Sequence, residues 1–150
     1  MRFLRLPLPA SGMARHVLPS DGAGAASADD ADVTALLDDY IGLYARDTLP
    51  RWRELFLPGF VATAPNDDGT VTTWGRDEFY ERQRAAFATG KPIGEFLENT
   101  RVERTGKLAC VRSDFVWTDG AVARRGRLML LLVDERGRLR VQALTFSYVG

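Results

Sequence analysis

Histidine and cysteine are almost missing from this chain of 150 residues, which contains one of each. His16 lies in the N-terminal segment, so the rest of the chain offers no imidazole for a zinc site or a Ser-His-Asp triad. Cys110 has no partner for an intrachain disulfide, and its apolar neighbours favour a small buried residue over a nucleophile. We therefore expect a cytoplasmic protein without a bound metal or other cofactor.

The chain also lacks a net charge and a long apolar run. Its 20 basic and 20 acidic residues cancel, and the arginines are scattered, so no global field favours nucleic acid or an anionic membrane. No segment approaches the ~18 apolar residues of a membrane span. We expect neither nucleic acid nor a membrane as a partner.

The first 28 residues contain no uninterrupted apolar core of a secretory signal. We interpret residues 1–28 as a flexible extension or a mis-assigned start, with Met13 as an alternative initiator. A different interpretation is an arm, residues 2–8, that docks on a partner subunit. Residues 29–150 are predicted to form one domain, because a chain of this length buries roughly two-thirds of its unfolded surface in one core.

Apolar residues repeat with helical spacing at the start of this domain. Counted from Val33, positions i, i+3, i+4, i+7, i+8 and i+11 are apolar or aromatic, which predicts a helix over residues 33–46. A short second helix follows, with Pro50 in its first turn and Phe56 near its end. We expect Pro58-Gly59 to terminate it.

Turn residues divide the rest of the domain into a hairpin, a third helix and four long strands. Asp67-Asp68-Gly69 predicts the hairpin, and Gly90 ends a helix that opens at residues 75–78. Turn signals with no helical pattern between them predict antiparallel neighbours. The predicted strands cover residues 60–64, 71–74, 96–104, 108–118, 121–133 and 139–148.

This order of elements, with a Gly-x-x-x-Phe helix start at 75–79 and a final G-x-L-x-V at 137–141, resembles the nuclear transport factor 2-like superfamily. Within it the chain is most similar to the SnoaL-like proteins, relatives of ketosteroid isomerases and polyketide cyclases. The resemblance implies an α+β, cone-shaped (cystatin-like) fold. Three N-terminal helices then pack on a strongly curved, mixed, mainly antiparallel sheet, above a deep apolar pocket and with frequent homodimerisation through the sheet.

The ketosteroid isomerase relatives use a Tyr on the first helix, an Asp base just before a Pro, and a second Asp on a later strand. Tyr40 falls at the position of that Tyr, whereas Ala64, before Pro65, falls at the base and Met129 near the second acid. Alanine cannot accept a proton, so isomerisation by this mechanism is not expected. Tyr40 is either a hydrogen-bond donor in the pocket or, more commonly for such a residue, part of the core.

The limonene-epoxide-hydrolase relatives use an Arg-x-Asp pair on a middle strand and another Asp on the last strand. Arg112 and Asp114 match the pair, and residues two apart on a strand share a face, so the arginine can orient an acid–base carboxylate. The other Asp falls near Leu144, which leaves a two-acid set incomplete. The alternative is a structural ion pair of Asp114 with Arg112, or with Arg125 or Arg127 on the next strand.

Three functions are compatible with these residues. The first is a SnoaL-like protein that binds a small, largely apolar molecule without a complete catalytic set. The second is an enzyme of cyclase, isomerase or epoxide-hydrolase type, in which Asp114 is the acid–base group, Arg112 orients it and Tyr40 stabilises an oxyanion. The third is a dimeric association module with a filled interior and no ligand. The predicted ligand-contacting residues are Tyr44, Trp52, Trp74, Phe79, Phe87, Trp117, Met129 and Gln142.

Overall fold

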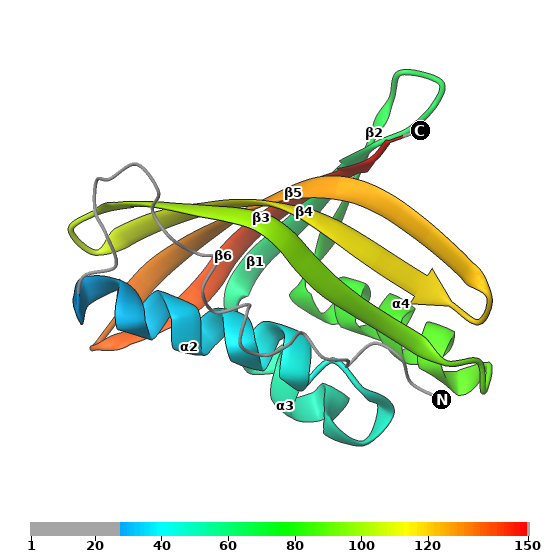
Figure 1. Cartoon of the computed structure of the whole chain (residues 1–150), viewed down its shortest axis with the longest axis horizontal. Helices are drawn as coiled ribbons and strands as arrows, with labels where there is room; N and C mark the ends of the chain where they lie inside the picture. Colours follow the sequence, from blue (N-terminus) through cyan, green and yellow to red (C-terminus); the bar gives the residue numbers. More distant parts are fainter. Residues whose placement is uncertain (1–27, 150) are drawn as a thin grey trace.

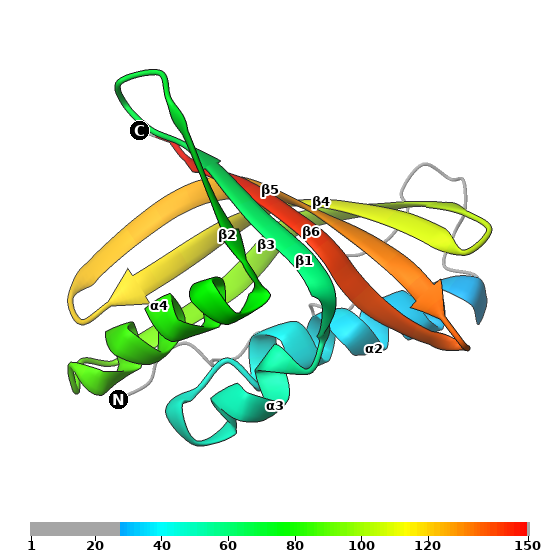
Figure 2. The same ribbon diagram turned by 180° about the vertical axis from the view of Figure 1, so that it is seen from behind.

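The computed structural model describes residues 28–149, in which helices lie against one face of a single curved sheet (Figures 1 and 2). The expectations for residues 1–27 lie outside this range. The helices are α2 (Ala28–Gly42), α3 (Leu49–Arg53) and α4 (Arg76–Ala88), with a 3-10 turn, η2 (Arg46–Thr48), before α3. The strands are β1 (Phe56–Pro65), β2 (Val71–Gly75), β3 (Ile93–Thr105), β4 (Leu108–Asp119), β5 (Val122–Glu135) and β6 (Arg138–Tyr148).

The six strands form one sheet in the order β2-β1-β6-β5-β4-β3. The pair β1–β6 is parallel and the other pairs are antiparallel. The predicted fold class is confirmed: an α+β arrangement of three helices on a mixed, mainly antiparallel, curved sheet. None of the helices within residues 28–149 is both long and apolar enough to span a membrane.

Helix α2 packs its predicted apolar stripe against the sheet. Val33, Leu37 and Tyr40 are buried, while Asp38 and Asp39 on the other side of the helix are exposed. The helix ends at Gly42 rather than at residue 46, in keeping with the low helix propensity of glycine.

The first strand begins earlier than its residues predict. Phe56 and the Pro58-Gly59 pair, expected in and after the second helix, belong to β1. Phe56 pairs with Val141 of β6, and the register shifts before the next pair, so the proline lies where the ladder is irregular. This parallel pairing, which no local pattern indicates, brings the last strand of the chain into the middle of the sheet.

The turns follow the sequence closely. Gly69, in the β1–β2 turn, and Gly90, after α4, have φ values of 91° and 85°, which side chains other than glycine rarely adopt. Strand β3 starts at Ile93, three residues before its predicted start, because Ile93 already pairs with Asp119 of β4. The earlier start adds Glu95 to the sheet, and this residue supplies the carboxyl group of the candidate site.

Candidate functional site

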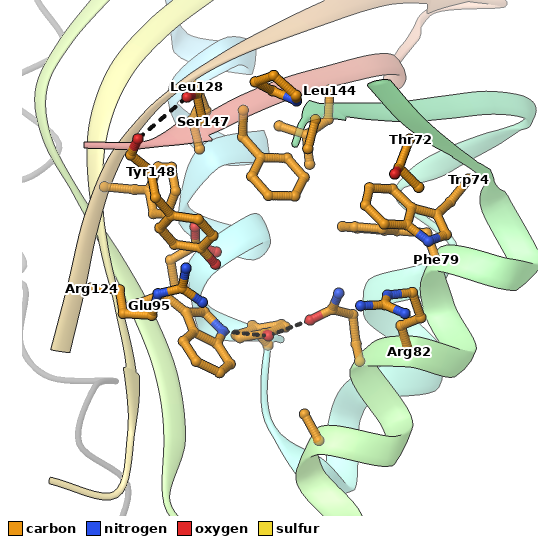
Figure 3. Close-up of a pocket in the computed structure, with 18 of the residues that line it drawn as sticks. Thr72, Trp74, Phe79, Arg82, Glu95, Arg124, Leu128, Leu144, Ser147 and Tyr148 are labelled. Carbon is orange, nitrogen blue, oxygen red and sulfur yellow. Dashed lines mark hydrogen bonds between the residues drawn. The ribbon is translucent and has the colours of Figure 1, made fainter. Parts of the chain in front are cut away.

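A cavity of about 810 Å³ lies between the concave face of the sheet and the helices (Figure 3). Aromatic rings and polar side chains both contribute to its wall. The aromatic residues of the lining are Tyr40, Tyr44, Trp52, Trp74, Phe79, Phe115, Trp117, Phe146 and Tyr148. The polar residues are Asn66, Asp67, Thr72, Arg82, Gln83, Glu95, Arg124 and Ser147.

The sheet contributes these side chains in rows that cross the strands. Trp117 of β4 pairs with Glu95 of β3 on one side and with Arg124 of β5 on the other, so the three share one face. Phe115 forms the next row, opposite Gly126. A Cβ atom at Gly126 would lie 2.5 Å from the Phe115 ring, so only glycine lets this ring lie across β5.

A chain of hydrogen bonds crosses the cavity wall from the sheet to α4. The Trp117 indole Nε1–H donates to the Tyr44 hydroxyl over 3.0 Å, and that hydroxyl donates to Gln83 Oε1 over 2.5 Å (Figure 3). Burial, and then the nearby Glu95, raise the pKa of Tyr44 well above its ordinary value. Tyr44 therefore stays neutral and ties the first helix region to both α4 and β4.

Glu95 is the carboxyl group that sequence reasoning missed. It is partly buried in the lining, and no hydrogen bond or ion pair reaches it from the described part of the chain. Burial raises its pKa from the ordinary 4.5 to about 8, so it is mostly protonated at neutral pH. Side chains two positions apart on a strand share a face, so Glu95 lies on the same face of β3 as the buried Leu97. A predicted strand that began at residue 93 instead of 96 would have placed Glu95 on this inner face.

Tyr40 lies in the same lining, 2% exposed, and its hydroxyl forms no hydrogen bond with any residue from 28 to 149. Its main-chain carbonyl accepts a 3.0 Å hydrogen bond from the Trp52 indole. Burial and the proximity of Glu95 raise the pKa of the Tyr40 hydroxyl. The cavity thus holds two neutral proton donors without partners among the described residues, the Tyr40 hydroxyl and the Glu95 carboxyl.

Two arginines stand on opposite sides of the hollow (Figure 3). Arg82 of α4 lies over the Trp74 ring with its Cζ 5.1 Å from the ring centroid, and Arg124 of β5 lies over Tyr148 at 3.7 Å. Within residues 28–149 neither guanidinium forms an ion pair with a carboxylate. Both are exposed, so they belong to the open part of the cavity.

The structure brings together six of the residues that sequence analysis named as pocket residues, and it places three of the predicted ligand-contacting residues elsewhere. Those in the lining are Tyr40, Tyr44, Trp52, Trp74, Phe79 and Trp117. Phe87 is buried against Tyr44 and is absent from the lining, although the preceding residue, Ala86, belongs to it. Met129 is exposed on the outer face of β5, and Gln142 donates to the Gly59 carbonyl over 3.1 Å. In place of Met129, the preceding residue Leu128 lines the cavity, together with Arg124 of the same strand.

Asp114 and Arg112 also lie outside the cavity, which corrects their expected position. On β4 the next residue, Phe115, faces inward, so Asp114 faces the other way. Its carboxylate accepts a 2.9 Å hydrogen bond from Asn99 and lies 3.5 Å from the Arg127 guanidinium. This is the structural ion pair of the alternative interpretation, formed with Arg127 rather than with Arg112.

The described residues include no group of three or more His, Cys, Asp or Glu side chains that could hold a metal ion. The lining offers hydrogen-bond donors, aromatic rings and two guanidinium groups. Its chemistry suits the binding of an organic molecule and proton transfer at the Glu95 carboxyl.

A family model for the SnoaL-like domain matches residues 33–149. No curated protein matches the sequence. Among solved structures, a nuclear transport factor 2-like protein of unknown function from Silicibacter pomeroyi is 17% identical, with a TM-score of 0.64 over 84% of this chain and 100% of that one. Aln2 from a Streptomyces species is 20% identical, with a TM-score of 0.66 over 81% and 92%. An uncharacterised protein with a cystatin-like fold from Caulobacter vibrioides is 19% identical, with a TM-score of 0.62 over 79% and 88%. At these identities the similarity establishes the fold.

Proposed function

Because the chain belongs to the SnoaL-like domain family, we propose that it binds a small, largely apolar molecule in the hollow beneath its sheet. The observation that carries this proposal is the cavity of about 810 Å³, in which nine of the 22 lining residues are aromatic. Its volume lies within the ~300–1,000 Å³ range of small-molecule sites, which are typically apolar with a few placed polar groups.

The polar groups indicate what the ligand presents to the protein. At neutral pH the Tyr40 hydroxyl and the protonated Glu95 carboxyl are both free to donate a hydrogen bond into the cavity. Two donors without protein partners favour a ligand with an acceptor oxygen at this end, such as a ketone, an ether or an epoxide. A hydrocarbon without an oxygen would leave both donors unsatisfied, at a cost in affinity.

A pair of adjacent alanines on α4 provides the test. Ala86 lines the cavity, whereas Ala85 is exposed and does not belong to the lining. We expect the neutral fluorescent dye N-phenylnaphthylamine to bind the wild-type protein, Ala86→Phe to weaken binding at least tenfold, and Ala85→Phe to leave it unchanged. Equal affinities in the two variants, or no dye binding by the wild type, would reject the proposal.

Acid–base catalysis is the second candidate function, and the uncharged Glu95 carboxyl inside the hollow favours it. With an epoxide, for example, the carboxyl donates its proton to the ring oxygen as the C–O bond breaks. A water then adds to the carbon, and its proton returns to the carboxylate, giving a diol. The enzyme predicted from sequence relied on Asp114, which faces away from the cavity.

The two carboxyl groups can be compared directly. Terpene epoxides and aromatic polyketides are incubated with the wild type, Glu95→Gln and Asp114→Asn, and products are identified by mass spectrometry. Turnover that is lost in Glu95→Gln and kept in Asp114→Asn supports the second candidate. Turnover lost only in Asp114→Asn would assign catalysis to the Arg112–Asp114 pair. If no protein turns over any substrate, the catalytic candidate is rejected and ligand binding remains the proposed function.

We also propose that two copies associate through the outer face of the sheet. Val61 of β1 and Leu131 of β5 are 40% and 46% exposed, and both pair with Ala143 of β6, so the three form one apolar row across three strands. We expect Leu131→Arg to reduce the mass measured by light scattering from dimer to monomer. Val122→Arg, at the end of the β4–β5 hairpin and also exposed, is the matched control. A monomeric wild type would refute this assembly.

A further inference from the structure

The guanidinium groups at the cavity mouth are arranged to receive an anion. Arg82 and Arg124 are the arginines of the lining, and each lies over an aromatic ring instead of pairing with a carboxylate of the described chain. A ring beneath a guanidinium leaves the edge of its N–H groups free, and those groups form the fork that matches a carboxylate. Both rings, Trp74 and Tyr148, belong to the lining as well, so the two cations are held beside the hollow.

The charge balance of the lining supports the same conclusion. Its basic and acidic residues are Arg82, Arg124, Asp67 and Glu95. Burial holds the pKa of Glu95 at about 8, so this carboxyl is mostly neutral at pH 7. Asp67 is exposed in the turn between β1 and β2. Two cations are therefore opposed by one anion, although the chain as a whole has a formal net charge of zero.

We propose that the ligand of this cavity is an aromatic molecule that carries a carboxylate, with its rings among the aromatic residues of the lining and its carboxylate against one of the two guanidinium groups, Arg82 or Arg124. The inference rests on the proposed binding function and adds the chemical class of the ligand. It also assigns an orientation, since the acceptor oxygen near Tyr40 and Glu95 lies inside the hollow and the anionic group at its open side. The aromatic residues of the lining can stack on the rings of the ligand, and the guanidinium groups at the mouth complement the negative charge of its carboxylate.

The experiment uses two probes that differ in charge but hardly in shape. Naphthoate and its neutral amide, naphthamide, compete with bound N-phenylnaphthylamine at pH 7 in the full-length protein. We expect the wild type to bind naphthoate about tenfold more tightly than naphthamide. Glutamine at the arginine that binds the carboxylate, Arg82→Gln or Arg124→Gln, reduces naphthoate affinity about fivefold, a size typical of one charge-assisted contact near solvent. Both variants leave naphthamide affinity unchanged. The double variant removes the preference.

The controls separate a failure of this inference from a failure of the binding function. Arg112→Gln removes an exposed guanidinium on the outer face of the sheet and keeps the wild-type preference. Unchanged dye affinity in the arginine variants shows that their cavities are intact. If the dye binds but the wild type does not prefer naphthoate, or if the double variant keeps the preference, the anion site is refuted and the apolar cavity stands. If the dye does not bind, the proposed function fails and this inference fails with it.

Discussion

Replacement of Glu95 by glutamine changes how the stability of this protein depends on pH. The pKa of this carboxyl is raised from 4.5 to about 8 by burial, so the folded state holds the proton between these values while the unfolded state has released it. The unfolded state therefore binds fewer protons, and the free energy of unfolding falls as the pH rises from about 4.5 to about 8. Glutamine has nearly the same shape and remains neutral, so the variant loses this dependence.

The size of the effect follows from the shift. One pKa unit corresponds to about 1.4 kcal/mol, so between pH 5 and pH 7 the wild type loses about 2–3 kcal/mol through this group. At pH 7 the variant should be more stable than the wild type by about 3 kcal/mol, and at pH 5 by about 1 kcal/mol. No histidine titrates in this interval within residues 28–149, since His16 lies outside them.

The measurement is urea unfolding, followed by tryptophan fluorescence, at pH 5, 7 and 8.5. Glu103→Gln on the same strand is the matched control, because Glu103 is exposed and lines no part of the cavity. The control should follow the wild type at each pH. The reasoning is wrong if Glu95→Gln and the wild type lose stability in parallel, since the carboxyl would then titrate equally in the folded and unfolded states.

Three further predictions concern packing and polar contacts. Gly126→Ala should lower the free energy of unfolding by about 1–3 kcal/mol, because its Cβ would lie 2.5 Å from the Phe115 ring. Gly59→Ala, where the Cβ would meet no atom within 4 Å, is the control in the same urea titration, and equal losses would contradict the argument. Tyr44→Phe should cost about 1–3 kcal/mol by leaving two hydrogen-bond partners unsatisfied, whereas Tyr40→Phe should change stability by less than about 0.5 kcal/mol. A larger loss in Tyr40→Phe would reveal a partner for its hydroxyl. Asp114→Asn should cost less than about 1 kcal/mol and leave dye affinity in fluorescence titrations unchanged, so weaker dye binding would place this residue near the cavity.

Several features of the site were predictable because they depend on local pattern. Tyr40, Tyr44 and Trp52 follow from the apolar spacing of the first helix and the short helix after it, and all three line the cavity. Gly69 and Gly90 mark turns whose backbone conformation requires glycine. The family resemblance rested on the same order of helices and turns, and the match over residues 33–149 confirms it.

The polar content of the cavity was not predictable from such patterns. In a strand, neighbouring residues face opposite sides of the sheet, so an error of one position exchanges the inside for the outside. Met129 was predicted in the lining, where Leu128 is found, and Asp114 faces away while Phe115 faces inward. Glu95 was overlooked because the predicted strand began one residue after it.

The sequence by itself determined the order of the helices and strands, the positions of the turns and the family, because each depends on neighbours along the chain. The tertiary structure decided which side of each strand faces the helices, through pairings between distant residues such as Phe56 with Val141. Those pairings set the direction of every side chain on the sheet. The same residues therefore form a cavity with a neutral Glu95 inside and two arginines at its mouth, an arrangement that no local pattern contains.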